Sequence, residues 1–308
     1  MRVVLVAATA AAVVLASAPA VVSTEDAGSA GTNDTDRRRR PVVVAAAGDI
    51  SDCRLLDCDA ARTASRVLQI DPDVALTLGD NQYESGTYQE FMAQYDRTWG
   101  RFKGRTRPSV GNHEYETPTA RGYFRYFGRK AGNPDKGYYS FNEKRWHLVA
   151  LNTGRLCRPV RCGPDSAQVR WLRRDLRQDD RKCVLAYWHH PPWSTGYHGN
   201  NGRVRTLWQV LARRGADVIL NGHDHSYERF ARRGAGGGAA RNGVRQFVVG
   251  TGGRALYGFE SPPGRLTQKR IGNRHGALEL LLRQNAYGWR FRSAAGPVLD
   301  SGGPVSCD

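Results

Sequence analysis

Several short apolar runs of this chain end directly in residues that can bind metal ions. One run ends in the sequence Asn221-Gly222-His223-Asp224-His225, and a strand that ends there would aim two imidazoles at one point. Earlier runs end in similar clusters, which are Gly48-Asp49, Gly79-Asp80-Asn81-Gln82-Tyr83, Gly111-Asn112-His113-Glu114 and His189-His190-Pro191. Aspartate, asparagine, tyrosine and histidine all serve as metal ligands. The pattern therefore indicates a two-metal hydrolase whose ligands follow separate strands.

Each of these residues also has an ordinary structural interpretation. A single aspartate after a strand, such as Asp49 or Asp80, is more often the N-cap of a helix than a ligand. Taken as a complete set, however, the clusters favour the ligand interpretation. They recur at strand ends, where binding sites form in α/β sheets. We interpret Asp49 and Asp80 as ligands.

The spacing of apolar residues predicts an α/β sandwich. Strands are predicted over 41–47, 74–78, 105–110, 138–141, 146–151, 184–188, 218–220, 246–249, 277–282 and 289–291. Helices are predicted over 60–68, 91–99, 168–176 and 204–211. The glycine-rich stretch 234–240 is expected to be a loop within the domain.

The N-terminus has the pattern of a secretory signal peptide over residues 1–20. Arg2 precedes an apolar run over 3–15, and small residues after it offer a cleavage site. The run is short for a membrane span, although an uncleaved anchor is the alternative. Residues 21–40 are predicted to be a disordered linker that ends in four arginines, and 41–308 a single catalytic domain. A secreted, extracellular protein without a membrane span after signal removal is expected.

Six cysteines fall in the exported part of the chain, an even number that favours disulfides. Many pairings are possible in principle. Two pairs have the same short spacing, Cys53 with Cys58 and Cys157 with Cys162. Pairing them locally leaves Cys183 with Cys307, which would fix the C-terminal tail to a strand.

The formal net charge of +17 favours anionic ligands. The sequence contains no helix-turn-helix, zinc finger or aromatic-basic strand signature, so specific nucleic-acid binding is not expected. Small phosphate esters are the expected substrates, and a monomer is the expected state.

The order of the polar clusters resembles that of calcineurin-like metallophosphoesterases, and most of all purple acid phosphatases. The resemblance covers roughly residues 42–292. Most members of the superfamily carry Asp-X-His at the first cluster, whereas this chain has Asp49-Ile50-Ser51. Tyr83 would replace the missing imidazole, as in the purple group. The resemblance implies a four-layer αββα sandwich of two mixed sheets flanked by helices.

The resemblance also implies two metal ions per chain, bridged by Asp80. The first ion would be iron, with the ligands Asp49, Asp80, Tyr83 and His225. The second would be zinc, iron or manganese, with the ligands Asp80, Asn112, His189 and His223. A phenolate and carboxylates suit a hard ferric ion, whereas imidazoles and an amide oxygen suit zinc, ferrous iron or manganese.

Two further histidines are implied to act on the substrate. His113 would donate a proton to the leaving alkoxide and Glu114 would orient it, although a role in supporting Asn112 is the alternative. His198 would bind phosphate or transfer a proton, unless it is an ordinary surface residue. His190 is expected to pack beneath its neighbour, His147 and His275 are expected to be structural, and residues 227–229 are expected to fix a loop.

The expected function is a secreted, metal-dependent, acid phosphatase-like hydrolysis of phosphomonoesters by a metal-activated hydroxide. A secreted phosphodiesterase or nucleotide hydrolase with the same dinuclear site is the alternative among enzymes. A basic secreted protein that binds phosphate without turnover is the alternative from another class.

Overall fold

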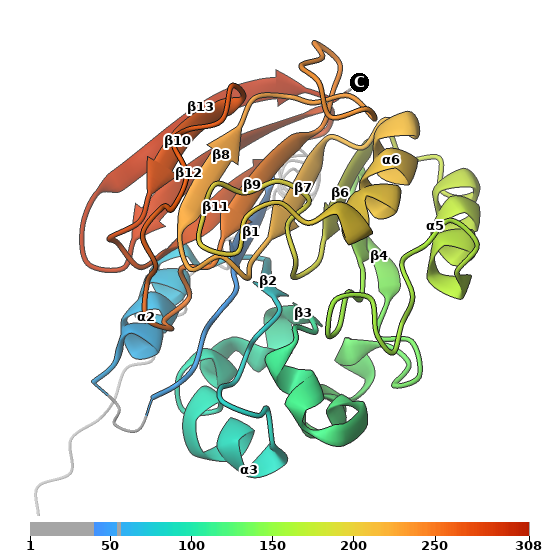
Figure 1. Ribbon diagram of the computed structural model, residues 1–308. Coiled ribbons are helices and arrows are strands. Elements are labelled where there is room, and N and C mark those ends of the chain that lie inside the picture. Colours follow the sequence, from blue (N-terminus) through green and yellow to red (C-terminus); the bar gives the residue numbers. More distant parts are fainter. Residues whose placement is uncertain (1–39, 54–56, 308) are drawn as a thin grey trace, which may run out of the picture. The chain divides into compact units, whose positions relative to one another are not determined.

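The computed structural model describes residues 40–53 and 57–307, which form two mixed β-sheets with helices on their outer faces (Figure 1). This architecture confirms the predicted four-layer sandwich. The predicted signal peptide and nearly all of the predicted linker lie outside the described residues. Within residues 40–53 and 57–307, no helix is long and apolar enough to cross a bilayer.

The first sheet has the strand order β13-β12-β11-β1-β2-β3. Its strands are β1 (Val42–Ala47), β2 (Val74–Leu78), β3 (Thr106–Ser109), β11 (Gly276–Leu282), β12 (Ala286–Ser293) and β13 (Val298–Ser306). Strands β1, β2 and β3 are parallel. Strand β11 pairs antiparallel with β1, and β11, β12 and β13 are each antiparallel to the next. The carboxyl ends of β1, β2 and β3 therefore lie at one edge of this sheet.

The second sheet has the strand order β10-β8-β9-β7-β6-β5-β4. Its strands are β4 (Tyr139–Glu143), β5 (Trp146–Ala150), β6 (Cys183–Tyr187), β7 (Val218–Asn221), β8 (Tyr227–Phe230), β9 (Arg245–Val249) and β10 (Thr267–Ile271). Strands β5, β6, β7 and β9 are parallel. Strand β6 and strand β7 thus deliver His189 and the residues after Asn221 to the same edge.

The alternation of side chains along a strand divides the interior into two apolar layers. On β6, Leu185 and Tyr187 belong to the core shared by both sheets, whereas Val184 and Ala186 belong to a second core. Residues of α5 and α6 complete that second core. A strand buried on both faces needs a continuous apolar run, which explains why β6 and β7 were recognisable from sequence.

The longer helices confirm three of the four predicted ones. They are α2 (Asp59–Ile70), α5 (Ala167–Gln178) and α6 (Arg205–Arg213), and the shorter ones are α3 (Tyr88–Glu90) and α4 (Arg121–Phe127). Helix α2 contacts β11 and β12 of the first sheet, and α5 contacts α6 on the second. Helix α5 begins at Ser166, whose side chain accepts a hydrogen bond from the backbone of Val169 at 3.2 Å.

The single helix predicted over 91–99 was wrong, because two shorter helices of other types lie there. A π-helix spans Phe91–Tyr95, and a separate 3-10 helix spans Trp99–Arg105. Phe91, Tyr95 and Trp99 are all buried, so their spacing places three aromatic rings in the core. Apolar spacing of this kind does not reveal which backbone hydrogen-bonding pattern joins the residues.

Residues 227–229 lie in strand β8, and Glu228 holds a loop as expected, because its carboxylate accepts hydrogen bonds from the amide and the hydroxyl of Thr195, both at 2.8 Å. Strand β8 pairs with β9 and β10. Strands β8, β10 and β13 were not predicted. Strand β10 is partly exposed throughout and β13 includes Gly302, Gly303 and Pro304, so neither carries the apolar alternation that identifies a strand.

All three expected disulfides are present: Cys53–Cys58, Cys157–Cys162 and Cys183–Cys307. The last bond joins β6 of the second sheet to the chain that follows β13 of the first. Its partners are 124 residues apart in sequence, compared with 5 for the pair Cys157–Cys162. A longer closed loop restricts the unfolded chain more strongly.

Replacing Cys183 and Cys307 together by alanine is expected to lower the free energy of unfolding by about 5 kcal/mol. The matched double variant at Cys157 and Cys162 is expected to lose about 2 kcal/mol, because its loop is short. Urea unfolding monitored by circular dichroism measures both. Equal losses in the two variants would contradict the assignment of the larger role to the long loop.

Candidate metal centre

The carboxyl ends of strands from both sheets meet at one place. The amide of Gly48 after β1 donates to Val249 O on β9 at 2.9 Å, across the two sheets. His189 Nδ1 after β6 lies 2.8 Å from Leu78 O at the end of β2. The residues that follow β1, β2, β6 and β7 are therefore neighbours, as expected from their positions at strand ends.

The four predicted ligands of the first ion lie together, with the other three around the hydroxyl of Tyr83. Its oxygen lies 3.0 Å from Asp49 Oδ1, 3.2 Å from Asp80 Oδ2 and 3.2 Å from His225 Nε2. His225 Nε2 is also 3.3 Å from Asp49 Oδ1. All four side chains are buried. The structure thus brings together the whole set that the sequence predicts for the first ion.

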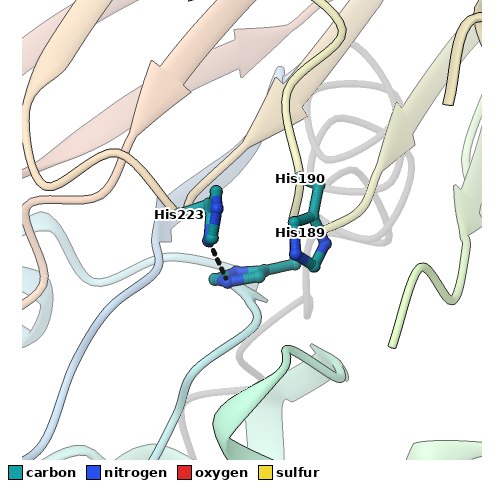
Figure 2. Close-up of side chains that lie close together, drawn as sticks. All are labelled: His189, His190 and His223. Carbon is teal, nitrogen blue, oxygen red and sulfur yellow. Dashed lines mark hydrogen bonds between the residues drawn. The ribbon is translucent and has the colours of Figure 1, made fainter. Parts of the chain in front are cut away.

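The four predicted ligands of the second ion also lie together, with the other three around His189 Nε2. This atom lies 3.1 Å from Asp80 Oδ2, 3.1 Å from Asn112 Oδ1 and 3.2 Å from His223 Nδ1. Figure 2 shows this last contact between His189 and His223 as a dashed line. Asp80 Oδ2 belongs to both groups, which is the position that a bridging carboxylate requires.

Hydrogen bonds to main-chain carbonyls orient two of the imidazoles. His189 Nδ1 is 2.8 Å from Leu78 O, and His225 Nδ1 is 2.7 Å from Ala255 O. A carbonyl oxygen accepts but does not donate, so each Nδ1 carries the proton and each neutral ring turns an unprotonated Nε2 inward. The inward nitrogens of these two rings are then acceptors, and they lie beside the carboxylates of Asp49 and Asp80. A cation satisfies such an arrangement, so the residues fit a metal centre.

The charge balance of the cluster leads to the same conclusion. Burial opposes the charged form of His189, yet the Asp80 carboxylate outweighs it and raises the pKa of His189 to about 9. Burial and the carboxylates of Asp49 and Asp80 raise the pKa of Tyr83 well above its usual value. Without a metal ion, therefore, the cluster favours the protonated form of His189 and the neutral form of Tyr83.

Three residues of the centre hold an unusual backbone conformation. The φ angles are 59° at Asp49, 46° at Asp80 and 71° at His223, in the left-handed region that residues other than glycine rarely adopt. Such conformations cost about 1–3 kcal/mol each and cluster at functional sites. The His223 amide donates to Asp49 Oδ2 at 2.8 Å, so the centre itself helps to hold the strained backbone.

Glycines let the strand ends approach closely. A Cβ at Gly111 would lie 2.1 Å from Asp80 Oδ1, and one at Gly222 would lie 2.6 Å from Asp49 Oδ2. Both positions need the absence of a side chain, because the carboxylates occupy the space. Gly111 and Gly222 are thus part of the site's geometry.

Glu114 does not orient His113, and that expectation was wrong. Its buried carboxylate accepts hydrogen bonds from the amides of Asn81 at 2.6 Å and Gly111 at 2.7 Å, and from two further amides after β2. His113 Nδ1 instead lies 2.6 Å from Glu84 O. Glu114 therefore ties the loops after β2 and β3 together.

His113 and His198 both border the cluster. The ring of His113 lies 4.3 Å from that of Tyr83, with Nε2 4.0 Å from Asp80 Oδ2, and its side chain is 28% exposed. The ring of His198 stacks on His223 at 4.2 Å. The His198 amide donates to Asp224 Oδ1 at 2.7 Å. Each histidine is placed to reach a molecule bound at the cluster.

The remaining histidines lie as expected. His190 Nδ1 lies 2.8 Å from Thr153 Oγ1, and its ring packs 4.3 Å from that of His223. His147 Nε2 is 2.8 Å from Asp175 Oδ2 on α5. His275 Nε2 contacts a main-chain oxygen.

Two residues near the cluster were missed by the sequence analysis. The ring of Tyr257 stacks on His225 at 4.1 Å. The guanidinium of Arg254 lies 4.6 Å over the ring of Tyr83 and pairs with Glu84 at 2.6 Å. Both belong to the segment after β9, which has neither a strand-end motif nor regular spacing, so no sequence signal identified them.

The sequence pattern of the family described as "Calcineurin-like phosphoesterase" matches residues 36–227. Purple acid phosphatase 15 of Arabidopsis thaliana is 26% identical over 209 residues, which are 55% of this chain and 38% of that protein. Tartrate-resistant acid phosphatase type 5 of Rattus norvegicus is 26% identical over 195 residues, which are 54% of this chain and 60% of the relative. The chain thus spans less than two thirds of these relatives.

Solved structures share the fold. The purple acid phosphatase PPD1 of yellow lupin superposes with a TM-score of 0.70 at 16% identity, over 84% of this chain and 52% of that one. GAP50, described as the anchor in the inner membrane complex of Plasmodium, superposes with a TM-score of 0.64 at 13% identity, over 87% and 90%. Because the family pattern matches more than half of the sequence, this chain belongs to the calcineurin-like phosphoesterase family.

Proposed function

We propose that this protein is a secreted, metal-dependent phosphatase that hydrolyses phosphomonoesters at a dinuclear centre. One observation carries the proposal. Two groups of four ligand atoms, one around Tyr83 Oη and one around His189 Nε2, share Asp80 Oδ2. Family membership and the similarity to purple and tartrate-resistant acid phosphatases support it.

Under this proposal, Asp49, Asp80, Tyr83 and His225 hold iron, and Asp80, Asn112, His189 and His223 hold zinc, iron or manganese. Two bound ions would supply a hydroxide from water at neutral pH and offset the charge that develops on the phosphate. The hydrogen bond from His113 Nδ1 to Glu84 O fixes the ring, so that Nε2 is free to give a proton to the leaving alkoxide. His198 is placed beside His223 to contact the phosphate.

Export is the second part of the proposal. Three disulfides are typical of proteins that fold in an oxidising compartment. The predicted signal peptide supports the same location. Hydrolysis of phosphodiesters at the same centre remains the alternative among enzymes.

A binding protein without turnover is the alternative from another class. The fold alone does not decide against it, because GAP50 shares the fold and is described as an anchor. The complete ligand set argues for catalysis, since a site that had lost its chemistry would be expected to lack at least one ligand. An assay of the metal-loaded protein on phosphate esters separates the two.

Replacing Asp80 by asparagine is expected to lower kcat/KM by at least about a thousandfold, equivalent to about 4 kcal/mol of transition-state stabilisation. The occupancy of both metals should fall together, because both groups of ligands include Asp80. Metal analysis and a phosphate-ester assay on the purified protein measure these effects. Asp71→Asn, at an exposed aspartate paired with Arg105, is the control and should keep both. Full turnover in D80N would rule out the bridging role.

The Tyr83→Phe variant tests the identity of the first metal. A ferric phenolate absorbs visible light, so the iron-loaded protein should show a broad charge-transfer band that Y83F lacks. Phenylalanine keeps the ring that packs against His113, so the fold should be retained. Absorption spectra with metal analysis give the answer. A colourless, active wild-type protein with two metals would exclude iron bound to Tyr83.

The His113→Ala variant tests the proton donor. Esters with poor leaving groups should lose about 10²–10⁴-fold in rate, whereas activated esters need little protonation and should change much less. Rates for alkyl and nitrophenyl phosphates provide the comparison. Glu84→Gln is the control, because the main-chain oxygen that holds His113 Nδ1 remains. An equal loss on both kinds of ester would remove His113 from this role.

A further inference from the structure

A cavity of about 780 Å³ lies on the loop that carries His198. Ser194, Thr195 and Asn200 of this loop line it. Its other walls include the side chains Trp193, Phe230, Arg233, Pro262, Pro263 and Arg265. None of the described residues that line the cavity is acidic. It therefore combines apolar walls with two positive charges.

Arg233 is the unusual member of this lining. It is only 8% exposed, and no carboxylate within residues 40–53 and 57–307 pairs with it. The nearest acidic side chain that acts on its charge is Glu228. That carboxylate already accepts hydrogen bonds from the amide and hydroxyl of Thr195 and from the hydroxyl of Thr267. Burial, opposed by Glu228, lowers the pKa of Arg233 to about 10, so the side chain stays charged at neutral pH.

Aromatic rings pack against this guanidinium, but one of its nitrogen atoms has no hydrogen-bond acceptor. The carbon of the guanidinium lies 4.9 Å from the ring centres of both Trp193 and Phe230. Nη1 donates to Gly237 O at 3.0 Å. Nε is buried and has no acceptor. A buried donor without a partner is unfavourable, and guanidinium groups recognise anions that carry two oxygens.

The walls of the cavity are held in place independently of any ligand. The ring of Trp193 packs on Trp208 at 4.5 Å, and Trp193 O accepts a hydrogen bond from Gln246 Nε2 at 2.9 Å. Gly237 has a φ of +87°, and a Cβ there would lie 2.6 Å from the Trp193 ring. The loop can approach the tryptophan because this residue is glycine. A preformed cavity binds a ligand without a large ordering cost.

We propose that this cavity binds a small organic anion with a flat apolar body. Its acidic group pairs with the guanidinium of Arg233, and its body packs against Trp193 and the two prolines. Arg265, at the exposed rim, adds a second positive charge. This site is separate from the metal centre, since none of the predicted metal ligands lines it.

Benzenesulfonate is a suitable probe, because it is anionic and flat and a sulfonate is a weak metal ligand. Benzenesulfonamide has nearly the same shape without the charge. Isothermal titration calorimetry on the full folded protein, both metal-loaded and metal-stripped, measures the affinity for each. We expect benzenesulfonate to bind at least tenfold more tightly than the sulfonamide, in both metal states.

Two variants locate the binding. Arg233→Gln removes the charge and should weaken binding of benzenesulfonate at least tenfold. Gly238→Leu should do the same by filling space, since Gly238 lines the cavity and a Cβ there meets no atom within 4 Å. Gly236→Leu is the matched control, because Gly236 also has open space but does not line the cavity. Its affinity should be unchanged.

The proposal fails if wild-type protein does not bind benzenesulfonate or binds the neutral sulfonamide equally well. Affinity that disappears when the metals are removed would place the probe at the metal centre and also overturn the proposal. Unchanged affinity in a folded R233Q protein would also overturn the proposal, because the ligand would then not pair with Arg233. If R233Q does not fold, G238L decides, and equal affinities in G238L and G236L overturn the proposal. None of these outcomes depends on turnover, so they are independent of the proposed phosphatase activity.

Discussion

The carboxylate of Asp80 connects the two halves of the centre. Its Oδ2 atom lies 3.2 Å from the hydroxyl of Tyr83 and 3.1 Å from His189 Nε2. Its Oδ1 atom accepts the amide of His113 at 2.9 Å, so the loop after β3 is held against the loop after β2. Burial disfavours the charged carboxylate, but His189 outweighs burial and lowers the pKa of Asp80. A charged group this deeply buried is stable only with positive charge beside it.

The backbone around this carboxylate is strained, and other contacts hold it. Asp80 has a positive φ, and its amide donates to Glu114 Oε2 at 3.1 Å. Burial, followed by the charge of Asp80, raises the pKa of Glu114 to about 7. The hydrogen bonds from backbone amides thus hold the Glu114 carboxylate in place, although the nearby negative charge of Asp80 is unfavourable for it. This balance explains why a glutamate lies behind the proposed ligands although its carboxylate does not orient His113.

Sequence reasoning identified the residues that follow strands, because their position depends on local patterns alone. Apolar runs predict β1, β2, β6 and β7, and the parallel arrangement of these strands gathers their ends. Residues such as Glu84, Arg254 and Tyr257 could not be predicted, since their contacts depend on how irregular loops fold back over the centre. Strand β10 was missed for a related reason: its partner strand, and not its own pattern, makes it a strand.

The loop of residues 191–201 has two sides with different chemistry. On one side His198 stacks on His223, and its amide donates to Asp224. On the other side Thr195 is held by Glu228, and Trp193 faces the guanidinium of Arg233. The loop backbone is short between these contacts, with Ser194 N donating to Asn200 Oδ1 at 3.0 Å. The same loop therefore joins the proposed anion cavity to the proposed phosphate-binding histidine.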